Sequence, residues 1–366
     1  MVKIVRALTG FICHRTFAFH VPIQSIRSKS LRLPSHSHGN TPINIENLNK
    51  KYSAMSDNGK VIIVGSINQD MTTYASSLPS PGQTILGSDF ITTAGGKGAN
   101  QAVAASSIGV VNTSHGVHMI GRVGNDSIGR SLLSSLQSKG VKLDENRARI
   151  TGAHTGVASI NVDLNTGQNT IVVAPGANLA LSKEDVDDSL ACLLGSGGEG
   201  KNVVLVQLEI KPSAALQTLR SASNLGALTI LNPAPAPKEW ELTQDWYCSI
   251  DILVPNETEL ASLCGVPNCD DVTGEGEEAM ARSLLDKGVR QAVIVTLGAR
   301  GAMIVRKSDT NVDNIQTVMI SEPADMPCKY KPVVDAVGAG DAFCGALAAY
   351  LSRGIGLDQA ASMACG

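Results

Sequence analysis

Short apolar runs recur through residues 60–366, and each run ends in glycine or polar residues. Runs of this length that are rich in Val and Ile are typical of strands buried on both faces of a parallel sheet. We expect strands within 61–68, 117–124, 202–209, 227–232, 251–256 and 291–298.

Helical patterns separate these runs. A glycine turn leads into an Ala-rich helix over 95–109, and further helices are expected near 126–139, 213–225, 257–264 and 276–288. Repeated alternation of strand and helix places helices on both faces of one sheet. The chain is therefore predicted to be an α/β protein with a mostly parallel central sheet.

Two stretches break this rhythm, 71–94 and 155–173. Both alternate Thr, Val and Ile with other residues, and the second contains the hairpin-like turn NTGQ. They predict a small antiparallel sheet beside the main one. Since ligands of α/β enzymes bind beyond the carboxyl ends of the parallel strands, such a sheet would act as a lid that excludes water.

Polar side chains follow several of the expected strands: Asn68, Asp70, Glu209, Asn256, Glu259 and Thr296, together with Gly298. The carboxyl ends of parallel strands share one edge of a sheet, so these residues should gather on one rim. A set of carboxylates and amides suits a sugar, because buried polar groups need partners and a polyol supplies many. The alternative is that each residue only forms a turn or caps a helix.

The segment GGKGAN, residues 95–100, offers backbone N–H groups, Lys97 and Asn100. It is not a Walker A loop, which needs G-x-x-x-x-G-K-[ST]. Its alternative role is tight packing of a strand against a helix.

The segment VVDAVGAGDAFCG, residues 333–345, places Gly338, Ala339 and Gly340 before a helix expected from about 341 to 353. Small residues let a phosphate approach the free N–H groups of the first helical turn, where the helix dipole favours negative charge. Asp341 is either the helix N-cap or the group that accepts a proton from an attacking hydroxyl. Asp335 lies before the loop and is expected to neutralise a cation that steadies it.

Composition narrows the function. Residues 60–366 hold 22 Lys and Arg against 31 Asp and Glu, and aromatic residues make up only 3% of the chain. Nucleic acid is therefore not expected as a partner, because binding it relies on clustered positive charge and stacking. A membrane is not expected either, since no apolar run approaches ~18 residues. The 8 cysteines are scattered and are interpreted as reduced thiols.

The first 59 residues differ from the rest, with eight Lys and Arg against two acidic residues. A basic, Ser-containing leader that is poor in acids is typical of an organellar transit peptide. We therefore expect a mitochondrial or plastid location, with residues 1–59 outside the fold. The alternatives are a non-targeting tail or a translation start at Met55, which would leave the protein in the cytosol.

Eight stretches in order resemble the PfkB-type carbohydrate kinases over residues 60–366: GSINQD, AGGKGANQAVAAS, GRVGNDSIG, QLE, NPAPA, PNETE, TLGARG and DAVGAGDAF. GSINQD and AGGKGANQA favour the ribokinase branch over kinases of adenosine, fructose or ketodeoxygluconate. The resemblance implies a ribokinase-like three-layer αβα sandwich with a small β-sheet lid. It also implies ATP-dependent phosphorylation of D-ribose at O5, and a homodimer formed through the lid.

The resemblance also implies roles for individual residues. Ribose would be bound by Asn68, Gln69, Asp70, Gly96, Lys97, Gly98, Ala99, Asn100, Glu209 and Asp341, with Asp341 as the catalytic base. The nucleotide would be bound by Asn256, Thr296, Leu297, Gly298, Ala299, Arg300, Gly301, Gly338, Ala339 and Gly340. Glu259 would act on Mg²⁺ through water, and K⁺ would be held by Asp335 and the carbonyl of Val337.

The chain departs from the family pattern in three places. Ala342 and Val337 stand where threonine is frequent, and the helix that begins near Leu357 stops at Gly366, where the family continues. We therefore expect a domain truncated at its C-terminus. Two alternatives follow: another sugar or nucleoside kinase of this type, or a non-catalytic sugar-binding protein. A nicotinamide dehydrogenase is disfavoured, because no G-x-G-x-x-G follows the first strand.

Overall fold

The computed structural model describes residues 59–108, 116–195, 200–238, 241–266, 275–307, 315–321 and 338–365. All of them belong to one compact unit within Asn49–Gly366. The leader expected over 1–59 lies outside the described residues, apart from Gly59. No helix in the described part of the chain is long and apolar enough to cross a bilayer.

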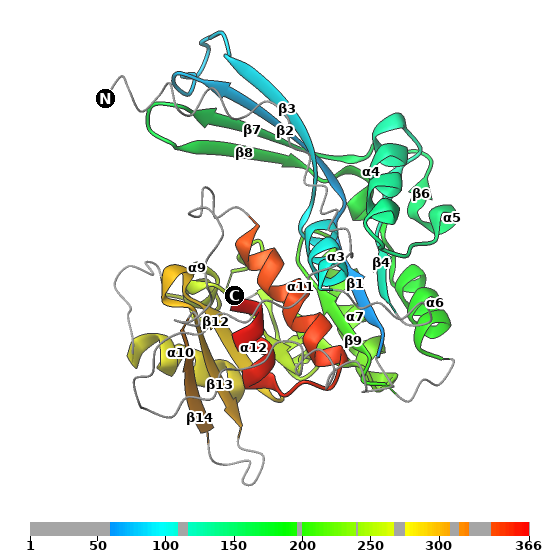
Figure 1. The fold of residues 1–366 in the computed structure, drawn as a ribbon, viewed down its shortest axis with the longest axis vertical. Helices are drawn as coiled ribbons and strands as arrows, with labels where there is room; N and C mark the ends of the chain where they lie inside the picture. Colours follow the sequence, from blue (N-terminus) through cyan, green and yellow to red (C-terminus); the bar gives the residue numbers. More distant parts are fainter. Residues whose placement is uncertain are drawn as a thin grey trace, which may run out of the picture. The chain divides into compact units, whose positions relative to one another are not determined.

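The central sheet has eight strands in the order β14-β13-β12-β11-β10-β9-β1-β4 (Figure 1). From β12 to β4 the neighbours are parallel, as predicted. These strands are β1 (Val61–Val64), β4 (Val117–Ile120), β9 (Val203–Val206), β10 (Leu228–Leu231), β11 (Ile252–Leu253) and β12 (Ala292–Thr296). The antiparallel strands β13 (Ala302–Lys307) and β14 (Ile315–Ile320) extend the sheet at one edge.

Alternate residues of the central strands enter two separate cores. Val61 and Ile63 of β1 belong to one apolar cluster, whereas Ile62 and Val64 belong to the other. The side chains of a strand point alternately to its two faces, so a continuous apolar run supplies both cores. All four residues of β1 are completely buried, which confirms the prediction that this strand is covered on both faces.

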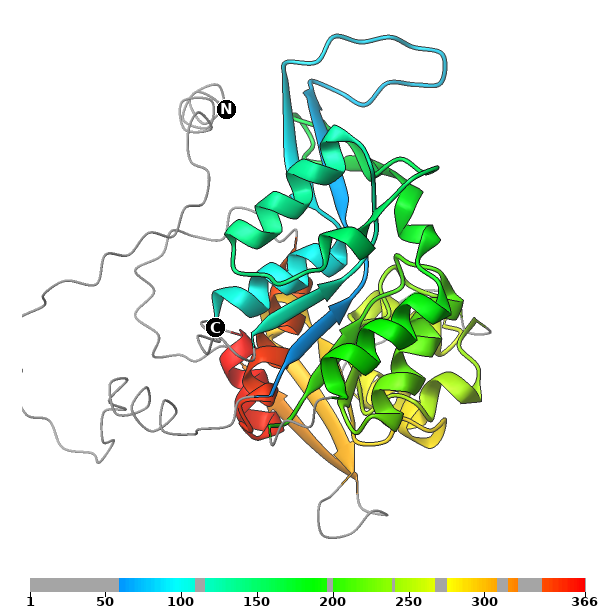
Figure 2. The same ribbon diagram turned by 90° about the vertical axis from the view of Figure 1, so that its right-hand side faces the viewer.

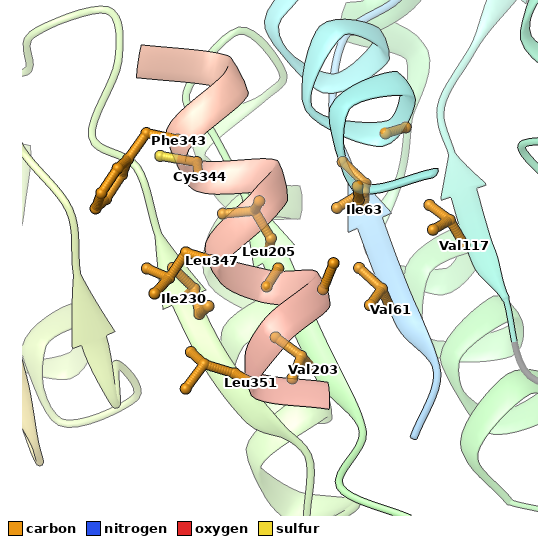
Figure 3. Close-up of a cluster of buried hydrophobic side chains, with 14 of the residues drawn as sticks. Val61, Ile63, Val117, Val203, Leu205, Ile230, Phe343, Cys344, Leu347 and Leu351 are labelled. Atoms are coloured by element: carbon orange, nitrogen blue, oxygen red, sulfur yellow. The ribbon is translucent and has the colours of Figure 1, made fainter. Parts of the chain in front are cut away.

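Helices cover each face of the sheet and complete the three-layer αβα sandwich (Figure 2). One layer contains α3 (Lys97–Ser107), α4 (Ser127–Ser138), α11 (Ala339–Ser352) and α12 (Leu357–Cys365). The other contains α6 (Lys183–Leu194), α7 (Pro212–Asn224), α8 (Gln244–Tyr247), α9 (Glu257–Leu263) and α10 (Glu275–Asp286). Figure 3 shows Leu347 and Leu351 of α11 beside the strand residues Leu205 and Ile230.

A second sheet has four strands in the order β3-β2-β7-β8. The strands are β2 (Asn68–Ala75), β3 (Asp89–Gly95), β7 (Gly156–Asp163) and β8 (Asn169–Ala174). The small β-sheet expected from the sequence is therefore present. A short two-stranded sheet pairs β5 (Val123–Gly124) with β6 (Arg149–Ile150), and the short helix α5 (Glu145–Ala148) directly precedes β6.

The small sheet is not purely antiparallel, as the alternation had led us to expect. Each hairpin pairs its own strands antiparallel, but β2 and β7 pair in parallel. Both are the first strand of their hairpin, and they run side by side in the same direction. This pairing joins residues 88 positions apart in the chain, such as Asn68 and Gly156, which local alternation does not reveal.

Helix α11 begins earlier than the sequence indicated. Gly338 is its N-cap with φ of 80°, and the helix runs from Ala339. Asp341 is consequently the third helical residue, and the interpretation of Asp341 as the N-cap is wrong. Glycine adopts this left-handed backbone readily but has no side chain that could cap the helix. The Ser, Thr, Asp or Asn that usually marks a helix start in a sequence is therefore absent here.

Candidate active site

Close packing of glycines joins α3 to the junction between β1 and β2. A Cβ on Gly98 would lie 2.7 Å from the main chain at Gly65 and Ser66, and Gly96 has φ of 89°. These two glycines therefore serve the tight strand-to-helix packing considered as the alternative role of GGKGAN. The contact brings the first turn of α3, with Lys97 and Asn100, beside Asn68.

Asp341 lies in the first turn of α11 with its carboxylate against α3. Oδ1 accepts a hydrogen bond from Nε2 of Gln101 at 2.9 Å, and Oδ2 accepts one from Nδ2 of Asn100 at 3.2 Å. Gly345 permits this approach, since a Cβ there would lie 2.4 Å from the carbonyl oxygen of Gln101. The side chain is 7% exposed, so both hydrogen bonds hold the carboxylate in one orientation.

Negative charges gather around Asp341, and they and burial shift the pKa values of the carboxyl groups there. Burial raises the pKa of Asp341, while Lys97 and the hydrogen bonds from Gln101 and Asn100 act in the opposite direction. Burial, followed by the negative charges of Glu209 and Asp341, raises the pKa of Asp70 to about 6. Three carboxylates close enough to influence one another are typical of a functional site.

Glu209 ties the sheet to α3. Its Oε2 accepts a hydrogen bond from the hydroxyl of Ser66 at 2.5 Å and another from the backbone N–H of Lys97 at 3.1 Å. Of the polar residues after the strands, Asp70 and Glu209 therefore meet Asp341 on one rim, as the strand-end pattern predicted, and the backbone N of Asn68 lies beside Gly96 at the start of α3.

Asn256 and Glu259 form a reciprocal capping box at the start of α9. Oδ1 of Asn256 accepts from the N–H of Glu259 at 2.8 Å, and Oε2 of Glu259 accepts from the N–H of Asn256 at 2.9 Å. The helix-cap alternative is thus true of this pair. It does not consume the second amide hydrogen-bonding group of Asn256 or the second carboxylate oxygen of Glu259.

One cavity of about 160 Å³ gathers residues expected on both the sugar and the nucleotide side. It is lined by Lys97, Asn232, Ala234, Val254, Asn256, Glu259, Thr296, Gly338, Gly340, Asp341 and Cys344. Burial raises the pKa of Glu259 to about 7, opposed by the N–H of Asn256 and by Lys97. A carboxylate facing a cavity at a helix N-terminus has the oxygen-donor chemistry that suits Mg²⁺ between protein and phosphate.

The remaining residues expected at the nucleotide lie in the turn after β12. The side chain of Leu297 is buried in the core, so only its main chain can face a ligand. Gly298, Ala299 and Arg300 form the short 3₁₀ helix η4 (Gly298–Arg300), and Gly301 has φ of 84°. The Arg300 guanidinium pairs with Glu277 and Glu257, which anchors this turn to α9 and α10.

Gln69 and Ala99 are placed beside the site without lining the cavity. Gln69 donates through Nε2 to the carbonyl of Thr93 at 2.7 Å within the small sheet, and Ala99 is buried in α3. Ala339 is exposed at the start of α11. Asp335 and Val337, expected to hold K⁺, lie outside the described residues.

Several site residues were not singled out from the sequence. Gln101 and Asn232 form one buried chain of amides with Asp341, since Nε2 of Gln101 also donates to Oδ1 of Asn232 at 3.1 Å. Asn232 directly follows the apolar run of β10, so the rule that found Asn68 and Asn256 would have found it. Cys344 lies one helical turn after Asp341 and faces the same cavity.

Comparison with known proteins agrees with this geometry. The family model described as pfkB family carbohydrate kinase matches residues 58–366. The chain belongs to this family. Its eight ordered motifs include the glycine segments at 95–100 and 338–340, which here border Asp341.

Individual relatives are similar over most of their length. The chain is 37% identical to a ribokinase of Mus musculus, covering 80% of this chain and 81% of the relative. It is 33% identical to a deoxyribokinase of Salmonella typhi, covering 79% and 85%. The solved structure of Arabidopsis thaliana ribokinase complexed with ribose and ATP has a TM-score of 0.69 and 30% identity, covering 84% of this chain and 90% of that one. The ribokinase-like fold is thereby confirmed.

Proposed function

We propose that this protein transfers the γ-phosphoryl group of ATP to O5 of D-ribose, giving D-ribose 5-phosphate and ADP. The observation that carries the proposal is the position of Asp341. Its buried carboxylate is held by two amides at the edge of a cavity that also contains the N-terminal turn of α11. The family and the relatives named ribokinase support the sugar and the nucleotide.

On the sugar side, the rim combines hydrogen-bond acceptors with donors. Asp70 and Glu209 would accept hydrogen bonds from sugar hydroxyls, while Asn68, Lys97 and Asn100 would donate them. Gln69, Gly96, Gly98 and Ala99 would complete the surface beneath the sugar, mostly through the main chain. A polyol suits such a mixed set because each of its hydroxyls both donates and accepts.

Asp341 would take the proton of the attacking hydroxyl. As the bond from O5 to phosphorus forms and the bond from phosphorus to the ADP oxygen breaks, the O5 proton passes to the Asp341 carboxylate. A loose phosphoryl-transfer transition state needs this proton removed only late, so orientation matters more than basicity. The raised pKa of Asp341 also brings it closer to that of a useful base.

On the phosphate side, the first turn of α11 supplies an anion-binding site. The backbone N–H groups from Gly338 to Gly340 are not used within the helix and face the direction favoured for negative charge. Lys97 lines the same cavity and would neutralise charge that develops on the transferred group. Asn256 would donate its free amide N–H to a phosphate oxygen.

Two cations and the nucleotide base complete the proposal. Glu259 would hold Mg²⁺ through water, and the ion would supply positive charge that offsets the charge of the phosphates. K⁺ would bind at Asp335 and the carbonyl of Val337. The turn from Thr296 to Gly301 would contact the nucleotide, mainly through its main chain. The small sheet would close over the sugar as a lid and would pair with that of a second copy.

The experiment is an ADP-release assay on the full chain with D-ribose, ATP, Mg²⁺ and K⁺. We expect turnover by the native protein and a loss of about 10³-fold in kcat for Asp341→Asn, because the proton acceptor is gone. Asp358→Asn is the matched control, since Asp358 is the first-turn aspartate of α12. No turnover by the native protein, or equal activity of Asp341→Asn and the control, would reject the proposal.

A second candidate sugar is 2-deoxy-D-ribose, because the chain is also 33% identical to relatives named deoxyribokinase. The same assay with D-ribose, 2-deoxy-D-ribose, D-fructose and adenosine separates the candidates. A kcat/KM that is higher for 2-deoxy-D-ribose than for D-ribose would assign the enzyme to the deoxy sugar.

A further inference from the structure

Asn178 is a buried amide whose partners are all at the junction between the two sheets. It lies in the 3₁₀ helix η1 (Gly176–Ala180), directly after the last strand of the small sheet, and is 1% exposed. A polar side chain so deeply buried costs free energy unless its hydrogen-bonding groups are satisfied. Asn178 satisfies them with the main chain around Ile67 and with the side chain of Asn68.

The hydrogen bonds of Asn178 have a fixed direction. Its Oδ1 accepts from the backbone N–H of Ile67 at 2.9 Å, and a backbone N–H can only donate. Nδ2 therefore lies on the other side, where it donates to the carbonyl of Pro175 at 3.0 Å and to Oδ1 of Asn68 at 2.7 Å. If Asn178 turned over, its amide N–H₂ would face the N–H of Ile67.

The orientation of Asn178 in turn decides that of Asn68. Nδ2 of Asn178 donates, so the group of Asn68 that faces it must be an acceptor, and Asn68 therefore directs its Oδ1 inward and its Nδ2 to the opposite side. Asn68 is only 3% exposed, so water competes little for the hydrogen bond at its inward-facing Oδ1. The backbone N–H of Ile67 thus orients the amide of Asn178, which in turn orients the amide of Asn68.

Gly156 leaves the space in which the two amides meet. It pairs with Asn68 in the parallel register of β2 and β7. A Cβ at Gly156 would lie 2.2 Å from Oδ1 of Asn68 and 2.4 Å from Nδ2 of Asn178. Both distances are well below van der Waals contact, so a methyl group there would separate the amides.

We propose that Asn178 is a positioning residue for sugar binding: it fixes the amide of Asn68 so that Asn68 presents a hydrogen-bond donor to the sugar. Asn178 does not touch the substrate and acts only through Asn68. The inference rests on the proposed function, since it assigns Asn68 to the sugar rim.

The test compares KM values for D-ribose and ATP in the full chain. For Asn178→Ala we expect KM for D-ribose to rise about tenfold, the usual effect of one lost buried hydrogen bond, with kcat and KM for ATP within about twofold. For Asn178→Asp we expect a larger rise, because the introduced carboxylate only accepts and turns the Asn68 amide over. Gly156→Ala should raise KM for D-ribose although both amides are retained.

Asn202→Ala is the matched control. Oδ1 of Asn202 accepts from the N–H of Lys60 at 2.9 Å, immediately before β1, as Asn178 binds the N–H of Ile67 after it. If the amide of Asn202 has only a structural role, its loss should lower thermal stability without changing KM for D-ribose. If Asn178→Ala behaves like Asn202→Ala, the proposal is overturned.

A double-substitution cycle decides whether Asn178 acts through Asn68. In an Asn68→Ala background we expect Asn178→Ala to cause no further rise in KM for D-ribose. Equal effects in both backgrounds would overturn the proposal.

The native protein, the two single variants and the double variant are also unfolded in urea. We expect the shifts of the unfolding midpoint caused by Asn68→Ala and Asn178→Ala to be non-additive. Additive shifts would overturn the link between the two amides. If the native protein turns over no sugar, the proposed function fails, and the unfolding cycle still decides the link between the two amides.

Discussion

The side-chain amide of Gln101 donates a hydrogen bond to Oδ1 of Asp341 over 2.9 Å, although the two residues are 240 positions apart. Gln101 is fully buried, and its Oε1 accepts from Nε2 of Gln207. Amides from α3 and from the segments that follow β9 and β10 therefore form one chain that ends at the carboxylate. Such a chain fixes the orientation of Asp341 and lowers its pKa against the effect of burial.

We expect Gln101→Leu to move the acid limb of the pH profile of kcat/KM to higher pH. The lost hydrogen bond had stabilised the ionised carboxylate of Asp341, so its pKa rises and more alkaline conditions are needed to ionise it. Gln207 and Asn232 lose a partner, which costs roughly 2 kcal/mol in the free energy of unfolding. An equal loss of activity at every pH would contradict this account.

Asp70→Asn should stabilise the ligand-free protein at pH 8. The pKa of Asp70 is raised from 3.8 to about 6 on folding. Its contribution to stability is therefore present below pH 4 and is lost as the pH rises through 6. After allowance for partial exposure we expect roughly 1 kcal/mol at pH 8, or about 2 °C in Tm.

The gain from Asp70→Asn should shrink as the pH falls from 6 to 4, which unfolding in urea at several pH values measures. Asp89→Asn, at an exposed aspartate that begins β3 of the same small sheet, is the control. A gain in stability that is independent of pH would show that ionisation of Asp70 does not destabilise the folded protein. KM for the sugar should rise in Asp70→Asn despite the added stability.

Asp126→Ala should weaken both α4 and the root of the small sheet. Asp126 caps α4 through the N–H of Gly129 at 2.7 Å, and it accepts from the N–H and the hydroxyl of the buried Thr155 at 2.8 and 2.7 Å. We expect a loss of roughly 3 kcal/mol, from the cap and from the unsatisfied Thr155 together. Asp126→Asn should lose less, because asparagine also caps helices well.

Asp144→Ala is the control for Asp126, since Asp144 caps α5 but has no hydrogen bond to Thr155. It should cost about 1 kcal/mol in the free energy of unfolding. KM for the sugar should rise only in the Asp126 variants, because Thr155 immediately precedes β7. A similar rise in Asp144→Ala would contradict a specific connection to the small sheet.

Gly338→Ala and Gly340→Ala form a matched pair at the anion-binding turn. Among the described residues, apart from the chain neighbours, a Cβ at either position would meet no atom within 4 Å, but only Gly338 of the two has a positive φ, of 80°. Gly338→Ala should therefore cost about 1 kcal/mol in the free energy of unfolding, whereas Gly340→Ala should fold as well as the native protein. Urea unfolding separates the two. Equal stability would show that α11 can begin elsewhere.

The local pattern of apolar and polar residues predicts much of the architecture. Runs such as Val61–Val64 are apolar at every position, and this alone indicates burial on both faces of a parallel sheet. Polar residues at the strand ends marked Asn68, Glu209 and Asn256 as candidates for one rim. The ordered motifs carried the family, because their glycines and carboxylates recur at fixed places along the chain.

Two other features of the backbone were decided by the tertiary structure alone. The parallel pairing of β2 with β7 joins Asn68 to Gly156, and no local period encodes such a contact. The start of α11 depends on the left-handed backbone of Gly338, which carries no side-chain signal.

The buried amides Gln101 and Asn178 read as ordinary polar residues until their partners, 240 and 110 positions away, are known. Apolar periodicity reports which face of an element is buried. A hydrogen-bond partner is set by where distant segments meet, so the sequence determined the framework and the folded chain determined the orientation of its polar groups.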